Sequence, residues 1–267
     1  MSANHEIVRT RGGTLAMRSL DAGEVMHPGV GPLVEAEQLY VRQSRLAERL
    51  LEGRTVVVFD VGLGAGSNAF AARAASERAG AGRLELVSFE RDLGALALAL
   101  ESPAAFGIDA EAATAARALL ADGRHETPRT TWRLEAGDVL EALARTSARA
   151  DVVYWDPFSP RANPTLWTVA AFAAVRRAAG PRCTLFTYSA STATRVALLL
   201  SDWAVGVGDA IGEKAHTTAA AADPADLARP LDRAWLGRLA RADAPLPFDA
   251  PAAAAARAAA ARQFQLG

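Results

Sequence analysis

The sequence predicts a doubly wound α/β fold: a mostly parallel sheet of seven strands, with helices on both faces and an antiparallel hairpin at its end. Three observations predict it. Short apolar runs alternate with longer helical patterns along most of the chain, and a glycine-rich turn follows the first buried run. The 267 residues, 51% hydrophobic and 22% charged, are enough for one large domain with its own core.

The strand predictions rest on short apolar runs bounded by turn residues. The run TVVVFD at Thr55–Asp60 is β-branched and almost uninterrupted, which is typical of a parallel strand buried on both faces. Because crossovers between parallel strands are right-handed, few topologies remain. The other expected strands are Leu84–Glu90, Thr130–Glu135, Ala150–Trp155 and Arg182–Ser189, followed by a closing pair at Trp203–Gly208 and Glu213–Ala219.

Helices are expected between these strands. Leucines recur roughly every three or four positions in Glu35–Glu52, which predicts one continuous helix. Residues 104–129 are expected to form a small insertion of helix and loop. Further helices are expected at Ser67–Arg78, at Asp92–Leu100, from Asp138 to Leu143, at Thr165–Ala179, at Ser191–Ser201, at Leu231–Ala240 and at Pro251–Gln263.

The composition divides the chain into three parts. Residues 1–34 contain several Gly and Pro turns and predict a lead-in of short hairpin or loop. Residues 35–220 hold the α/β domain. Residues 221–267 are rich in Ala, Arg and Pro and predict a helical extension. The last part of this extension could be a docked helix, a dimer element or a frayed tail, and the sequence does not decide among these. The sequence also does not give the oligomeric state.

Composition also argues against several classes of protein. The single cysteine, Cys183, forms no internal disulfide, and four scattered histidines without ligand spacing argue against a metal site. No apolar signal core and no charge-free apolar run of 18 residues occur, so a cytoplasmic location without membrane contact is expected. A net charge of −1 creates no general attraction to nucleic acid, so such a substrate would need a local basic face.

The first strand is followed by the loop DVGLGAGSN, in which Asp60 precedes Gly62, Gly64 and Gly66. Glycines let the backbone approach a ligand closely. Dinucleotide enzymes favour Gly-x-Gly-x-x-Gly, which seats a pyrophosphate on the helix N-terminus. Here the spacing is Gly-x-Gly-x-Gly beside an acid, which suits a cationic ligand such as a sulfonium with an ammonium group.

Acids also end the next two strands. Glu90 closes the second strand, where a carboxylate can accept hydrogen bonds from both ribose hydroxyls. Asp138 follows the third, where it can reach an adenine amino group. Each acid alone could be a solvated loop residue. Three acids at successive strand ends together predict S-adenosylmethionine as the cofactor, because ligands bind at the carboxyl ends of such strands.

The fourth strand runs into DPFSPRANPTLW, which places Asp156 next to the expected cofactor cleft. A carboxylate beside aromatic faces suits a nitrogen nucleophile on a base, and Phe158 and Trp167 would supply those faces. The alternative is structural: Asp156 would cap the following turn and Trp167 would belong to the core.

DPFSPRANPTLW resembles the DGFAPxxNPxLW signature of the MnmC-type tRNA methyltransferase family, which methylates 5-aminomethyl-2-thiouridine at the wobble position of tRNA. DVGLGAGSN is similar to that family's GFGTGLN loop, and VSFE to its SxE strand end. GEVMHPGVGPLVEAEQLYV resembles the family's lead-in, and TYSASTATRVALLLSDWAVGVGDAIGEKAHTTAA its last strands. The resemblance covers most of residues 23–220.

The resemblance implies a stand-alone, Rossmann-like class I S-adenosylmethionine-dependent methyltransferase with Asp156 as its catalytic carboxylate. Two departures matter. Pro157 replaces the family's glycine, and residues 208–216 replace the basic GFGRKRE cluster, which weakens the case for tRNA docking. The cofactor contacts that the resemblance implies are Gly62, Gly64, Gly66, Asn68, Glu90 and Asp138.

The substrate side is a hypothesis. Phe158 and Trp167 would stack on the uracil ring, Tyr188 would form a second wall, and Lys214 would meet a substrate phosphate. The partner is therefore tRNA or, as the alternative, a small-molecule or protein amine methylated by the same fold. A non-catalytic nucleoside-binding relative and an NAD-dependent oxidoreductase are two further alternatives, which the intact acids and the glycine spacing respectively disfavour.

Overall fold

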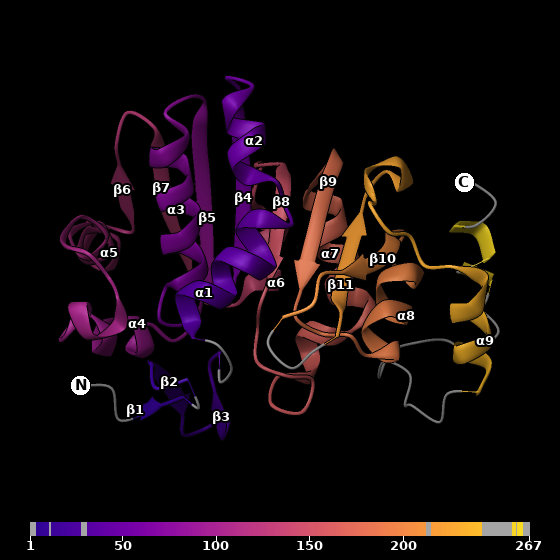
Figure 1. Ribbon diagram of the computed structural model, residues 1–267, viewed down its shortest axis with the longest axis horizontal. Coiled ribbons are helices and arrows are strands. Elements are labelled where there is room, and N and C mark those ends of the chain that lie inside the picture. Colours follow the sequence, from indigo (N-terminus) through magenta and orange to yellow (C-terminus); the bar gives the residue numbers. More distant parts are fainter. Residues whose placement is uncertain are drawn as a thin grey trace.

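An eight-stranded sheet forms the centre of the molecule in the computed structural model, which describes residues 4–10, 12–27, 31–211, 215–241, 258–259 and 261–263. The strand order is β10-β11-β9-β8-β4-β5-β7-β6 (Figure 1). The five strands β9, β8, β4, β5 and β7 run parallel to one another. At one end β11 pairs antiparallel with both β9 and β10, and at the other β6 pairs antiparallel with β7. The predicted doubly wound α/β fold is confirmed.

All seven predicted strands occur, and their ends differ from the predictions by a few residues. Buried apolar side chains alternate between the two faces of each parallel strand, so both faces carry a core. The strands are β4 (Thr55–Val61), β5 (Arg83–Glu90), β7 (Thr130–Ala136), β8 (Ala150–Trp155), β9 (Ala179–Thr187), β10 (Ala204–Gly208) and β11 (Thr217–Ala221).

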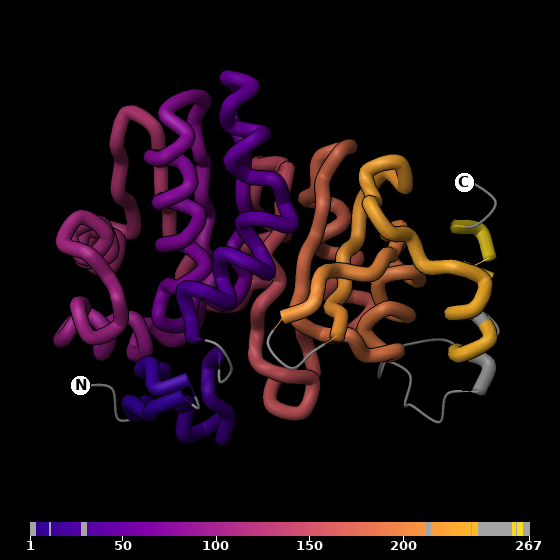
Figure 2. Tube along the Cα trace, viewed as in Figure 1, coloured from indigo at the N-terminus to yellow at the C-terminus, as the bar shows by residue number. Residues whose placement is uncertain are grey.

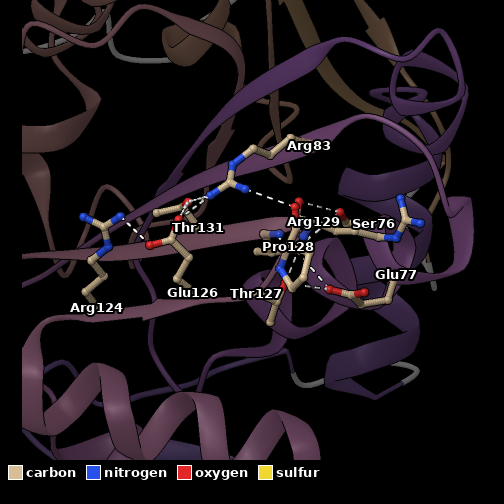
Figure 3. Close-up of polar contacts among 10 residues, drawn as sticks. Ser76, Glu77, Arg83, Arg124, Glu126, Thr127, Pro128, Arg129 and Thr131 are labelled. Atoms are coloured by element: carbon tan, nitrogen blue, oxygen red, sulfur yellow. Dashed lines mark hydrogen bonds and ion pairs between the residues drawn. The ribbon is translucent and has the colours of Figure 1, made fainter.

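The eighth strand, β6 (Arg124–Glu126), was not predicted, because three polar residues give no periodic signal. It forms from the segment that was expected to be helix and loop only, and it pairs antiparallel with β7. Figure 3 shows Glu126 between the guanidinium groups of Arg83 and Arg124, at the amino ends of β5 and β7. These contacts are solvent-exposed, so each contributes little to stability, and they lie at the edge of the sheet opposite the site described below.

The prediction of one helix over Glu35–Glu52 is wrong. The segment forms α1 (Pro32–Ala36), the π-helix η1 (Glu37–Arg42) and α2 (Leu46–Leu51). Arg45 is left-handed at φ 54°, and the Ser44 hydroxyl donates to the Val41 carbonyl, so a side chain competes with the helical ladder here. The leucine spacing detects the buried face but not this break. Tyr40, in η1, is fully buried, with its ring 5.1 Å from that of Tyr154.

Helices cover both faces of the sheet. On one face α1, α2, α3 (Ser67–Ala79), α4 (Gly94–Ala99) and α5 (Ala110–Asp122) pack over residues such as Val58 and Trp132. On the other, α6 (Val139–Arg145), α7 (Val169–Ala178), α8 (Thr192–Leu200) and α9 (Arg233–Arg241) are grouped around residues such as Phe59 and Trp155. The expected helix Thr165–Ala179 is split, because Thr168 caps α7 by accepting a hydrogen bond from the Ala171 amide.

The N-terminal residues form a separate antiparallel sheet of β1 (His5–Arg9), β2 (Leu15–Ser19) and β3 (Glu24–Val25). In Figures 1 and 2 this indigo layer lies below the large sheet, on the side where β9 ends. The expected hairpin layer is therefore present, and it lies at the carboxyl ends of the parallel strands.

The C-terminal extension is docked where the structure describes it. Trp235 and Leu239 of α9 are buried, and so is Ala259. The Gln263 side chain bonds to both the amide and the carbonyl of Val205 on the edge strand β10. Most of the expected helix Pro251–Gln263 lies outside the described residues. No helix in the described part of the chain is long and apolar enough to cross a membrane.

Candidate active site

A cavity of about 1010 Å³ opens at the carboxyl ends of the parallel strands, and residues of the N-terminal sheet complete its lining. The charged groups around it are unbalanced. Among the described residues seven carboxylates line it, against one arginine and two histidines. Such an excess favours ligands that carry positive charge. The carboxylates are Asp21, Glu24, Glu35, Glu90, Asp92, Asp138 and Asp156.

The glycine loop after β4 forms one wall of this cavity. Gly62 has φ 89°, and a Cβ atom there would lie 2.6 Å from the Asp156 carbonyl oxygen. The amide of Gly62 donates to the Phe89 carbonyl, so the loop is tied to the end of β5. Gly64 also lines the cavity. Gly66 does not; a Cβ there would lie 2.7 Å from the Phe70 ring, so this glycine serves the packing of the first turn of α3.

Glu90 and Asp138 both line the cavity, and backbone amides hold both side chains. Glu90 accepts from the amides of Arg91 and Asp92 through Oε1, and from the amide of Gly64 through Oε2. Asp138 caps α6 by accepting from the Leu140 amide at 2.7 Å. A carboxylate oxygen has two lone pairs, so both groups keep capacity to accept from the hydroxyl or amine of a ligand.

Asp60 lies beneath the loop and does not line the cavity. Its side chain is fully buried, with Oδ2 accepting from the Ser88 hydroxyl at 2.8 Å and Oδ1 without a hydrogen-bond partner. The Ser88 oxygen in turn accepts from the Trp132 indole N–H. Burial raises the pKa of Asp60 to about 7, although the Ser88 hydrogen bond opposes this shift.

Asp60→Asn is expected to change how stability depends on pH. The pKa of Asp60 is about 7 in the folded protein and near 4 in the unfolded chain, so the wild type loses stability as pH rises from about 4 to about 7. The asparagine variant lacks this loss, which amounts to at most about 4 kcal/mol. Thermal melts of both proteins from pH 4 to 8 measure it; parallel melting curves across that range would contradict it.

Asp156 stands at the end of β8, and three residues surround its carboxylate. Oδ2 accepts from the side-chain amide of Asn68 at 2.8 Å and lies 3.5 Å from Nε2 of His27. The hydroxyl of the buried Tyr40 also faces the carboxylate and favours its charged form. Burial nevertheless raises the pKa of Asp156 above its ordinary value. Asn68, predicted as a cofactor contact, is itself buried behind Asp156 and does not line the cavity.

His27 and Glu35 were not predicted as site residues. Nδ1 of His27 lies 3.8 Å from Oε1 of Glu35, so the imidazole stands between two carboxylates. Burial alone would lower the pKa of His27, but Asp156 and Glu35 together raise it above its ordinary value. No spacing rule relates positions 27, 35 and 156. The fold brings them together from the end of β3, from α1 and from β8.

The loop after β8 is held from two sides. Glu24 of β3 accepts hydrogen bonds from the amide and hydroxyl of Ser159 and from Arg161. On the core side Trp167, only 4% exposed, donates from its indole to the Phe158 carbonyl at 2.8 Å.

Of the predicted substrate contacts, Phe158 and Tyr188 line the cavity. Tyr188 also donates a hydrogen bond to the Pro157 carbonyl. Trp167 does not reach the cavity, because its indole packs in the core against Phe172 and Tyr188. Lys214 lies outside the described residues.

These residues fit S-adenosylmethionine. The glycine loop leaves space where side chains would collide with Asp156, and an unpartnered buried acceptor lies beneath it. Two further acids present acceptors where ribose and adenine are expected, and the excess of carboxylates suits a cationic ligand.

Comparisons with known proteins agree with this geometry. Residues 113–223 match a family described as S-adenosyl-L-methionine-dependent methyltransferase. Two curated relatives are named tRNA 5-methylaminomethyl-2-thiouridine biosynthesis bifunctional protein MnmC. The one from Burkholderia vietnamiensis is 33% identical over 213 residues, which is 72% of this chain and 32% of the relative. The one from Burkholderia thailandensis is 31% identical over 188 residues, 66% of this chain and 29% of the relative. The chain thus spans about a third of the length of these relatives.

Solved structures share the fold. The crystal structure of MNMC2 from Aquifex aeolicus superposes with a TM-score of 0.76 at 23% identity, and covers 98% of this chain and 85% of its own. Spermidine synthase from Thermotoga maritima reaches a TM-score of 0.50 at 11% identity, over 82% of this chain and 68% of its own. At these identities the likeness concerns the fold alone.

Proposed function

Because this chain belongs to the S-adenosyl-L-methionine-dependent methyltransferases and is a relative of the MnmC proteins, we propose that it methylates the aminomethyl nitrogen of a modified wobble uridine in tRNA. The names of the curated relatives support this substrate. It would act in the cytoplasm, where tRNA is modified. The observation that carries the proposal is the buried carboxylate of Asp156, which lies against the glycine loop and in the acid-lined cavity.

The cofactor would be held by groups that the structure already orients. The backbone of Gly62 and Gly64 would face its methionine part, and Glu90 and Asp138 would accept hydrogen bonds from its ribose and adenine. Asp60 would act from beneath the loop, through its field or a bridging water. Bound S-adenosylmethionine supplies a methyl group on a positively charged sulfur.

Asp156 would act on the substrate amine. An alkylamine is mostly protonated at neutral pH, so it must lose a proton before its lone pair can attack a methyl carbon. Asp156 would accept a hydrogen bond from the amine, orient it and take the proton, directly or through water. A neighbouring carboxylate alone would raise the pKa of the amine and keep it charged. Burial of the cavity floor would lower that pKa, because burial disfavours the charged form.

The base that carries the amine would lie against Phe158 and Tyr188, whose side chains line the same cavity. Aromatic faces of this kind stack on unpaired bases in many RNA-binding sites. The loop that carries Phe158 is fixed by Glu24 and Trp167, and Tyr188 donates to the Pro157 carbonyl of the same loop. Both walls would therefore be in position before the substrate arrives.

Incubation with tRNA that carries 5-aminomethyl-2-thiouridine tests the proposal. With S-adenosylmethionine present, the wobble nucleoside is expected to become heavier by one methyl substitution, as read by mass spectrometry of the digested tRNA. The same tRNA without cofactor is the control. An unchanged nucleoside profile, with a protein that binds the cofactor, would exclude this substrate.

A small-molecule or protein amine is the second candidate, because the cavity is acidic and residues 208–216 lack the basic cluster of the resembled family. Binding of unmodified and modified tRNA across a salt series separates the two. If tRNA is the substrate, affinity is expected to fall with a log–log slope of about −2 or steeper, which corresponds to two or more phosphate contacts. A flat salt dependence or no binding would favour the small-molecule or protein amine.

A further inference from the structure

We propose that Glu35 and His27 form a positioning pair that holds Asp156 in its charged state and in one orientation, so that the substrate amine meets an ionised carboxylate. This inference rests on the proposed role of Asp156 as the group that receives the amine proton. Both residues line the cavity.

The geometry is a chain of three side chains from three separate elements. His27 follows β3 and directs Nδ1 to Glu35 and Nε2 to Asp156, at 3.8 Å and 3.5 Å. All three side chains are at most 14% exposed. Asn68 and His27 both meet the same oxygen, Oδ2, so that Oδ1 would be the oxygen presented to the amine.

The backbone of His27 is part of this arrangement. Its φ of 50° lies in the left-handed region, which residues other than glycine rarely adopt. Such conformations persist only where the surroundings impose them, and they gather at functional sites. Here His27 follows β3 by two residues, and its side chain lines the cavity.

The charges explain why a cation is needed at this point. His27 interacts with three buried carboxylates: Glu35 from α1, Asp60 from β4 and Asp156 from β8. Without it these acids would repel one another, and burial would favour the protonated form of Asp156, which cannot accept a proton. The hydroxyl of Tyr40 faces Asp156, and that of Tyr188 donates to the neighbouring Pro157 carbonyl. Both hydroxyls are neutral, because burial and Asp156 raise their pKa values. His27 therefore supplies the compensating charge, and Glu35 keeps that charge on the imidazole.

The proton balance is simple. The ammonium nitrogen would give its proton to Asp156, and the freed lone pair would form the new C–N bond. The bond between the methyl carbon and the cofactor sulfur would break at the same time, and its electron pair would stay on that sulfur. The proton would leave Asp156 for solvent after product departure. His27 would stay protonated throughout, with its charge 3.5 Å from Oδ2, and would not release its own proton. It acts on the amine only through Asp156.

The first test needs no substrate. An NMR titration of the imidazole of His27 in the cofactor-free protein is expected to give a pKa above 6.5, and Glu35→Gln is expected to lower it by about one pH unit or more. Glu37→Gln is the matched control: it removes an acid two residues away that pairs with Arg78 at the surface, and should leave the value unchanged. A wild-type value at or below 6.5, or one that Glu35→Gln does not move, overturns the pair.

The second test reads the pH profile of methyl transfer. His27→Asn removes the charge and keeps a residue that tolerates positive φ, so folding should survive. The acid limb of the profile is expected to move to higher pH by about one unit, which lowers kcat/KM about tenfold at pH values on that limb. Glu35→Gln should shift the acid limb in the same direction, and Glu35→Asp should bring it part of the way back to the wild-type position. Glu37→Gln should leave the acid limb unchanged.

The two tests separate this inference from the proposed function. If no amine is methylated although the His27 titration depends on Glu35, the pair stands as an electrostatic unit and the proposed reaction fails. If methylation occurs and His27→Asn leaves the pH profile of the folded variant unshifted, the proposed reaction stands and the positioning role is wrong.

Discussion

Asp156→Asn is expected to lower kcat by about 100-fold to 10,000-fold, the range that a positioned proton acceptor contributes. Asparagine has the same shape and keeps an oxygen that can accept from Asn68, so the loop after β8 should stay in place. It cannot take a proton from the amine, and it carries no charge to orient an ammonium group. Cofactor binding should change by less than about threefold, because that contact is assigned to other residues.

Single-turnover methylation and calorimetric titration of S-adenosylmethionine measure the two quantities separately. Asp151→Asn is the matched control: it makes the same chemical change on the same strand, but at the opposite end, where Asp151 accepts from the Val57 amide. That variant should lose some stability and keep its turnover. Full turnover of folded Asp156→Asn with bound cofactor would remove Asp156 from the mechanism.

Gly62→Ala is expected to weaken cofactor binding by about 100-fold or more and to destabilise the fold by about 2–4 kcal/mol. The new methyl group would lie 2.6 Å from the Asp156 carbonyl oxygen, and backbone cannot move aside as a flexible side chain can. The positive φ of 89° adds conformational strain for any residue with a Cβ atom. The loop must therefore shift away from β8, and with it the amide that bonds to the Phe89 carbonyl.

Gly80→Ala provides the comparison, because Gly80 also has positive φ, at 66°, but its Cβ would meet nothing within 4 Å. It should cost about 1 kcal/mol of stability and leave cofactor affinity unchanged. Chemical denaturation measures the free energy of unfolding of both variants, and calorimetry measures their cofactor affinity. The differences between the two variants are due to the contact with Asp156. Equal affinities in the two variants would show that the loop does not approach the cofactor closely.

The parallel sheet could be predicted because its strands carry their signal locally. TVVVFD and ADVVYW carry apolar side chains on both faces. TVVVFD ends in an acid and runs into a glycine turn, and ADVVYW is followed by Asp156 and a turn, so strand, strand end and candidate site were found together. The residues at those ends are indeed gathered at one edge, where Gly62, Glu90, Asp138 and Asp156 line a common cavity. Their individual roles stay predictions.

Features that depend on tertiary contacts could not be predicted. The break at Arg45 follows from a serine that bonds backwards and from a tyrosine that is buried against another tyrosine, neither of which alters the spacing of leucines. His27 was not recognised because its partners, Glu35 and Asp156, come from elements that meet only in the fold. Trp167 was expected in the cavity because it follows the active loop closely, yet an indole this large is better accommodated in the core.

Glu24 accepts hydrogen bonds from Ser159 and Arg161, and His27 lies beside Asp156. These contacts limit where the chain can be shortened. Composition sets the first 34 residues apart from the rest, but residues among them, Glu24 and His27 included, complete the lining of the cavity. A shortened chain that began at α1 would keep every parallel strand and still lack a wall beside the carboxylate of Asp156. Engineers who graft this catalyst onto another scaffold would have to carry the small leading sheet with it.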